Sequence, residues 1–220
     1  KGLLRRLELA LLNKPGAYEI ADELIQLCKQ NELFVLTNRE DELYDKNLGE
    51  ETILGFYKND LWEVTKEVFG FEKGNQTDNF CIYLNDLYGR APDGSGTDNR
   101  LRFWFGKPSN GGSYYIFSKL EETSYPGTIR LPYYPEIPIL RLAEVYYVAC
   151  ETMIGKDNVK ALGYLNDVRE SRNLARLNGS YGNDEIMEFL MREMRKDFIG
   201  EGRMFMIYKR LDKEFYVKKG

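Results

Sequence analysis

One stretch of the chain, from Pro138 to Arg172, restricts the possible folds more than any other. Each of its halves carries apolar side chains at the three- and four-residue spacing of an amphipathic helix. The first half contributes Ile139, Leu142, Ala143, Tyr146, Ala149, Cys150 and Met153, and the second contributes Ala161, Leu162, Leu165 and Val168. Gly155 stands between them, where a glycine suits the end of a helix. The pattern predicts an antiparallel helical hairpin whose first helix begins at Glu136.

A similar helix pair is predicted at residues 1–32. Its apolar positions are Leu3, Leu4, Leu7, Ala10 and Leu11 in one helix, and Ala17, Ile20, Ala21, Leu24, Leu27 and Cys28 in the next. Two such pairs suggest tetratricopeptide-like repeats, although the full signature of that repeat is absent. A further helix is expected from Asn183, its predicted N-cap residue, and another after a break at Gly200 or Gly202.

Residues 33–135 differ in character, because turn-forming residues are frequent there. Glu51–Tyr57 is a candidate short strand. Arg100–Gly106 and Ser113–Leu120 flank a turn-rich segment and predict a β-hairpin or two extended arms. The expected fold class is therefore mainly α, with tetratricopeptide-like helical hairpins and a turn-rich insertion that contains a small β-hairpin.

The expected organisation is a single domain over residues 1–220. It comprises a helix pair at 1–32, an irregular insertion at 33–135 and C-terminal helices at 136–220. Because the sequence opens inside a predicted helix, we expect the domain to be truncated at its N-terminal side. A long irregular insertion in a helical domain is uncommon and is usually functional.

Composition argues against several classes of function. The chain has no histidine, the commonest general base and metal ligand, and its three cysteines form no CxxC pair, so no metal site is predicted. A net charge of -4 gives no electrostatic reason to bind nucleic acid or an anionic lipid surface. No cofactor is predicted, since the glycine-rich stretches at 94–99 and 110–112 lack the features of a phosphate-binding loop.

Three carboxylates, Glu193, Asp197 and Glu201, recur every four residues and would share one helix face. Like charges at this spacing repel one another unless cations lie between them. The neighbouring predicted helices supply Arg169, Arg172, Arg203 and Arg210. We predict an ion-pair network that ties the last helices together; the alternative is a solvated charged face.

Three motifs follow one another in residues 136–220. The first carries Leu140, Arg141, Leu142, Ala143, Glu144 and Tyr146; the second carries Ala161, Leu162, Leu165, Asn166, Val168, Arg169, Arg172 and Leu174; the third carries Glu193, Phe198, Glu201, Gly202, Arg203 and Arg210. In this order they resemble the C-terminal part of the SusD/RagB-type outer-membrane glycan-binding lipoproteins. The third motif departs from the family pattern at Met194, Asp197, Met206 and Ile207.

The resemblance implies a binding protein without catalytic activity. Such a protein is lipid-anchored at the surface of the outer membrane, where it captures oligosaccharides for import through a SusC-like TonB-dependent transporter. Contact with the membrane would come only through an N-terminal lipid anchor that this sequence does not contain. The resemblance further implies a structural corner made by Arg141, Glu144, Asn166, Arg169, Glu193, Glu201 and Arg203.

Sugar rings stack on aromatic faces, while their hydroxyls need amide, carboxylate or guanidinium partners. Residues of these types gather in the insertion, and the predicted glycan contacts are Trp104, Arg102, Asn110, Tyr114 and Tyr115. Trp104 is the first candidate for a stacking platform, although an aromatic residue in a strand is also often a core residue.

Two other functions remain open. A protein-interaction scaffold of helical repeats would need an exposed concave groove. A glycoside hydrolase would need a carboxyl group with a raised pKa, and arginines beside the carboxylates disfavour one because they lower carboxyl pKa values.

Overall fold

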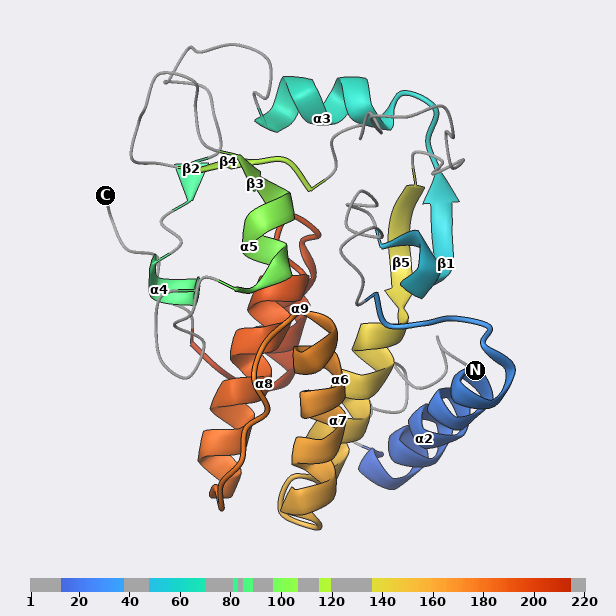
Figure 1. The fold of residues 1–220 in the computed structure, drawn as a ribbon, viewed down its shortest axis with the longest axis vertical. Helices are drawn as coiled ribbons and strands as arrows, with labels where there is room; N and C mark the ends of the chain where they lie inside the picture. Colours follow the sequence, from blue (N-terminus) through green and yellow to red (C-terminus); the bar gives the residue numbers. More distant parts are fainter. Residues whose placement is uncertain are drawn as a thin grey trace.

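The computed structural model describes residues 13–37, 48–69, 81–82, 85–88, 97–106, 115–119 and 136–214. Within these residues the fold is mainly helical, as predicted (Figure 1). The long helices are α2 (Lys14–Asn31), α6 (Leu142–Met153), α7 (Asn158–Ser171) and α8 (Asn183–Asp197), followed by the shorter α9 (Arg203–Arg210). Between α2 and α6 lie η2 (Gly49–Glu51), β1 (Thr52–Tyr57), α3 (Leu61–Phe69), β2 (Cys81–Ile82), α4 (Asn85–Tyr88), α5 (Asn99–Trp104), β3 (Phe105–Gly106), β4 (Tyr115–Phe117) and β5 (Glu136–Arg141).

Helix α6 is the centre of the main core. Every residue of α6 except Glu144 is buried, because α2, α7 and α8 all pack against this helix. The turn into α7 passes through Gly155, whose φ of +81° is a backbone conformation that favours glycine. The predicted α6–α7 hairpin is therefore confirmed (Figure 1).

Helix α2 packs on α6 through one narrow stripe. The buried residues of α2 are Ala17, Ala21, Ile25 and Cys28. Two alanines in this stripe allow the axes of the two helices to lie close together. Residues 1–12, the predicted partner helix of α2, lie outside the part of the chain that the structure describes.

The predicted helix start at Glu136 is wrong. Residues Glu136–Arg141 form strand β5, which pairs antiparallel with β1, and α6 begins only at Leu142. Pro138 explains the difference, because it has no backbone N–H and pushes Ile137 towards an extended conformation. The strand predicted at residues 51–57 is confirmed as β1.

The predicted hairpin arm at Arg100–Gly106 is only partly strand. Phe105 pairs with Phe117 of β4, so the two predicted arms do meet. The preceding residues instead form α5, because the side chain of Asp98 caps that helix by accepting the backbone N–H of Arg100 at 3.0 Å. With α3 as well, the insertion contains more regular structure than the sequence predicted.

The insertion has its own apolar cluster, made by Leu48, Leu87, Tyr88, Trp104, Phe105 and Phe117. It abuts the turn after α8, where Gly200 has a φ of +77°. A Cβ atom at Gly200 would lie 2.5 Å from the ring of Phe117, so glycine lets this ring approach the turn. The predicted break between α8 and α9 is confirmed at Gly200 and Gly202. The N-cap of α8 is Gly182, one residue before the predicted Asn183.

Candidate functional site

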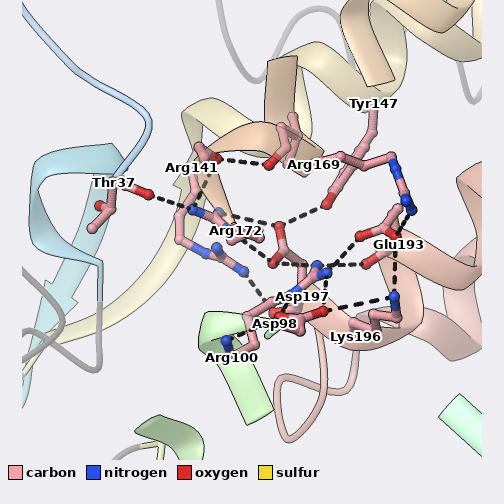
Figure 2. A network of polar contacts seen from close by, with 12 residues as sticks. Thr37, Asp98, Arg100, Arg141, Tyr147, Arg169, Arg172, Glu193, Lys196 and Asp197 are labelled. Atoms are coloured by element: carbon pink, nitrogen blue, oxygen red, sulfur yellow. Dashed lines mark hydrogen bonds and ion pairs between the residues drawn. The ribbon is translucent and has the colours of Figure 1, made fainter. Parts of the chain in front are cut away.

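A network of buried charged side chains joins the insertion to helices α7 and α8 (Figure 2). We call it the charge network; its members are Glu51, Asp98, Arg100, Lys119, Arg141, Arg169, Arg172, Glu193, Lys196, Asp197 and Glu201. No side chain in it is more than 6% exposed. Buried ions need close partners of opposite charge, and each member of the network has them.

The acidic ladder of α8 accepts cations from several elements, as the sequence predicted. Glu193 lies 2.8 Å from Nη1 of Arg169 and 2.6 Å from Nη2 of Arg100. The Oδ1 atom of Asp197 lies 3.3 Å from Nε of Arg172 and 3.1 Å from Nη1 of Arg100. The carboxylates on one helix face are therefore separated by guanidinium groups.

Glu201 was predicted to continue the face of this helix, but α8 ends at Asp197 and Glu201 lies in the turn that follows. It still binds cations from both sides. Its Oε1 atom accepts Lys119 Nζ at 2.5 Å and Arg141 Nη2 at 2.8 Å, and its Oε2 atom lies 2.9 Å from Nε of Arg203. The predicted ladder contact of Arg210 is wrong, because its guanidinium instead forms a bidentate pair with Glu151 at 2.6 and 2.7 Å.

Arg141 and Glu144 lie in different elements, although the predicted helix from Glu136 would include both. Arg141 lies in extended backbone at the end of β5, with a φ of -117°, and its side chain is fully buried. Glu144, at the start of α6, pairs with Arg203 of α9 at 2.8 Å. Arg141 thus pairs with a carboxylate and Glu144 with a guanidinium group. Both pairs connect the corner between β5 and α6 to the chain after α8.

Asn166 has a different role from the charged motif residues. Its side-chain oxygen accepts the backbone N–H of Leu177 at 2.8 Å, and its side-chain N–H donates to the carbonyl of the same residue at 3.2 Å. The buried amide of Asn166 thus satisfies both backbone groups of Leu177, as a neighbouring backbone segment would, and fixes the chain that follows α7.

The sequence did not predict several members of the charge network. The insertion supplies Glu51, Asp98, Arg100 and Lys119, while α8 supplies Lys196. Asp98 had a usable signal, since an aspartate before a helical pattern is a good N-cap. Nothing in the local sequence distinguishes Glu51 from its exposed neighbour Glu50, so its role depends on tertiary packing alone.

The cations of the network hold two of its carboxylates, Asp197 and Glu201, in the ionised form. Burial alone would raise the pKa of Asp197, but Arg172, Arg100 and Arg141 outweigh it and hold that pKa well below its usual range. Burial likewise opposes ionisation of Glu201, but Arg141 and Lys119 lower its pKa. A carboxyl held ionised in this way cannot serve as a general acid at neutral pH, so this arrangement suits a structural role.

The prediction that Trp104 offers a surface on which a sugar stacks is wrong. Its side chain lies in the apolar cluster of the insertion and is 2% exposed. Lys119 Nζ covers one face of the indole at 4.1 Å from the ring centroid. The ring therefore has no free face for a sugar, and the core alternative holds.

The other predicted glycan contacts are only partly described. Arg102 is exposed on α5, with its guanidinium 5.2 Å from the ring centroid of Phe103. The side chain of Tyr115, in β4, is not described, and Asn110 and Tyr114 lie outside the described residues. Their proximity to Arg102 stays a prediction.

Other aromatic side chains are exposed at positions that the sequence did not single out. Phe56 and Tyr57 of β1 are 63% and 61% exposed, and Phe205 of α9 is 59% exposed. The Tyr57 hydroxyl donates to Oδ1 of Asn59 at 3.0 Å. Alternation in the strand could have indicated that one of its aromatics faces solvent, but not that both do.

A family model described as the SusD family matches residues 74–219. The chain belongs to the SusD family. This match includes all three motifs and every member of the charge network except Glu51. No curated protein sequence matches the chain.

Solved structures share the fold of this SusD-family chain. A SusD superfamily protein from Bacteroides vulgatus is 21% identical, with a TM-score of 0.72 over 100% of this chain and 49% of its own. A SusD-like carbohydrate binding protein from the same organism is 18% identical, with a TM-score of 0.66 over 96% of this chain and 44% of its own. Surface glycan-binding protein A from Bacteroides uniformis is 18% identical, with a TM-score of 0.64 over 96% of this chain and 48% of its own. The SusD-family chain thus spans about half the length of these structures.

Two further features of the described part of the SusD-family chain concern its helices and a groove beside them. None of its described helices is long and apolar enough to cross a bilayer. An open groove of about 470 Å³ lies beside α2, α6 and α7, and its apolar lining includes Phe34, Val35, Leu36, Leu142 and Tyr146. That volume lies within the usual range for small-ligand sites.

Proposed function

We propose that this SusD-family chain binds a glycan and delivers it for uptake. The observation that carries the proposal is the family match over residues 74–219. The names of two similar structures, a SusD-like carbohydrate binding protein and a surface glycan-binding protein, support it. In this function the protein binds its ligand and does not transform it.

The glycan contacts are proposed to lie in the insertion, with Arg102 as the described member and Asn110, Tyr114 and Tyr115 as the others. Arg102 projects from α5, two residues after Arg100. The guanidinium of Arg100 is held by Asp98 at 2.7 Å and by Glu193 at 2.6 Å. A rigid helix lowers the conformational entropy lost on binding, so the charge network supports a preformed site.

The proposed partner is a SusC-like TonB-dependent transporter of the outer membrane. The proposed location is the outer face of that membrane, reached through a lipid anchor. Membership of the SusD family and the resemblance of the C-terminal motifs support both proposals. Direct contact with nucleic acid is not part of this function, in keeping with the net charge of -4.

A glycan array with the purified chain tests this function. We expect retention of a defined set of oligosaccharides, with competition by the same sugar free in solution. Retention of no glycan by correctly folded protein would refute the proposal. Product analysis of the bound sugars in the same experiment detects hydrolysis, which would favour a glycoside hydrolase instead.

The groove beside α2, α6 and α7 favours a second candidate function, a helical-repeat scaffold that binds a peptide. Val35, in the apolar lining of this groove, is 52% exposed. A peptide library screened beside the glycan array separates the two functions. Binding of peptides without any glycan would support the scaffold.

A further inference from the structure

The ribbon formed by β1 and β5 brings an aromatic ring and a carboxylate together on one face. Tyr57 lies directly opposite Glu136, and Gly55 lies opposite Pro138. Residues directly opposite each other in an antiparallel pair point to the same side of the sheet, as do residues two apart in one strand. Gly55, Tyr57 and Glu136 therefore share a face of the ribbon.

The carboxylate of Glu136 occupies the space above Gly55. A Cβ atom built on Gly55 would lie 1.8 Å from Oε1 of Glu136 and 2.4 Å from its Cδ. No other residue type could leave this space open. The absence of a side chain at Gly55 thus makes room for the Glu136 carboxylate on the face that it shares with Tyr57.

No cation among the described residues neutralises this carboxylate. Neither an ion pair nor an attractive charge accompanies Glu136, and partial burial alone raises its pKa. The charged residues that follow β1, Lys58 and Asp60, pair with each other at 2.6 Å. In contrast to every carboxylate of the charge network, Glu136 keeps its oxygens available for a ligand that can donate hydrogen bonds.

The aromatic member of this face is accessible. Tyr57 is 61% exposed, and its hydroxyl is anchored by the side-chain oxygen of Asn59 at 3.0 Å. An anchored ring loses little freedom when a ligand stacks on it. The side-chain amide N–H groups of Asn59 add hydrogen-bond donors at the ring's polar edge.

We propose that Tyr57, Glu136 and Asn59 form a subsite for a neutral pyranose, an inference that rests on the proposed glycan-binding function. The sugar ring stacks on Tyr57, while two of its hydroxyls donate to the Glu136 carboxylate. Sugars that carry carboxylate or sulfate groups are disfavoured, because the uncompensated negative charge of Glu136 repels them. The subsite selects neutral over acidic oligosaccharides.

The test compares neutral oligosaccharides with oligogalacturonides of equal length, each titrated calorimetrically into the folded chain. We expect wild-type protein to bind a neutral member at least about tenfold more tightly than any oligogalacturonide. Glu136→Gln keeps the shape of the side chain and removes its charge, so it should reduce this preference by about tenfold. Tyr57→Ala should weaken the neutral sugar by at least about tenfold.

Gly55→Ala supplies an independent variant, because its methyl group must displace the flexible end of Glu136 while the ribbon stays intact. We expect Gly55→Ala to weaken binding of the neutral sugar and, like Glu136→Gln, to reduce the preference for it, with an unchanged unfolding midpoint. The matched control is Phe205→Ala, which removes an equally exposed aromatic from α9 and should leave affinity unchanged.

The outcomes separate the two proposals. If wild-type protein binds no oligosaccharide, the glycan-binding function fails and the subsite fails with it. If wild-type protein binds an oligosaccharide but Glu136→Gln leaves the ratio of neutral to acidic affinities unchanged, the function stands and the subsite is refuted. Unaltered affinity in both Tyr57→Ala and Gly55→Ala would refute it as well.

Discussion

Arg172, at the C-terminal end of α7, and Glu51, at the end of η2, form a bidentate ion pair in the interior of the protein. Nη1 lies 2.5 Å from Oε1, and Nη2 lies 2.9 Å from Oε2. The same carboxylate accepts the backbone N–H of Thr37 at 2.9 Å. A single acidic residue of the insertion thus holds both the C-terminal helices and the segment that follows α2.

Glu51→Gln should destabilise the protein by about 3 kcal/mol, because it leaves the buried guanidinium of Arg172 with Asp197 as its remaining carboxylate. Urea unfolding measures this loss. Glu188→Gln is the control: Glu188 is 73% exposed and pairs with Arg192 at 3.5 Å, so its loss should cost less than about 0.5 kcal/mol. Equal effects of the two changes would contradict the assigned role of Glu51.

Stability should fall in acid because of Asp197 and Glu201. Both have folded pKa values below their unfolded values, so their contribution is present above the unfolded pKa and is lost as the pH falls through the folded one. Unfolding free energy measured from pH 7 towards pH 3 should therefore decrease below roughly pH 4.5. Glu201→Ala should lower the melting temperature at pH 7 and flatten this decrease; an unchanged melting temperature would show that the charge network does not stabilise the fold.

Lys119 should also make stability rise with pH, but in the alkaline range. Burial lowers its pKa from 10.5 to about 8, although Glu201 partly opposes the shift. Between these two values the unfolded chain binds more protons than the folded one, so stability gained from this group rises with pH. The difference in unfolding free energy between wild type and Lys119→Met should increase from pH 8 to pH 9.5. A constant difference would mean that the pKa of Lys119 is not lowered.

Trp104→Ala should destabilise the protein by about 3–5 kcal/mol, as expected for truncation of a large buried side chain. The loss is measured by urea unfolding. Trp104→Phe, which retains most of the apolar volume, should cost much less. If Trp104→Ala leaves stability intact and abolishes glycan binding, the indole contacts the sugar and its buried position is wrong.

The sequence predicted the helical core because its signals are local. The apolar spacing in α6 and α7 defines their hairpin, and the four-residue spacing of Glu193, Asp197 and Glu201 defines a face that needs cations. The pairing of Arg169 with Glu193 follows directly from these two patterns.

The insertion could not be predicted in the same way, because its signals compete. Apolar residues around Trp104 fit a strand as well as a helix, and only the cap at Asp98 decides for α5. The burial of Trp104 and the exposure of Tyr57 both depend on packing between segments far apart in the sequence. Local composition marks aromatic residues of a type suited to sugars but does not tell which of them face solvent.

The central claim, that the insertion carries the glycan contacts, is tested most directly by calorimetric titration of an oligosaccharide retained on the array. Wild type is compared with Arg102→Ala, in the insertion, and with Arg176→Ala, an exposed arginine after α7 that pairs with Glu170. We predict that Arg102→Ala weakens binding by about tenfold, the loss of one charged hydrogen bond, while Arg176→Ala binds like wild type. Wild-type affinity in Arg102→Ala, or an equal loss in both variants, would contradict the account.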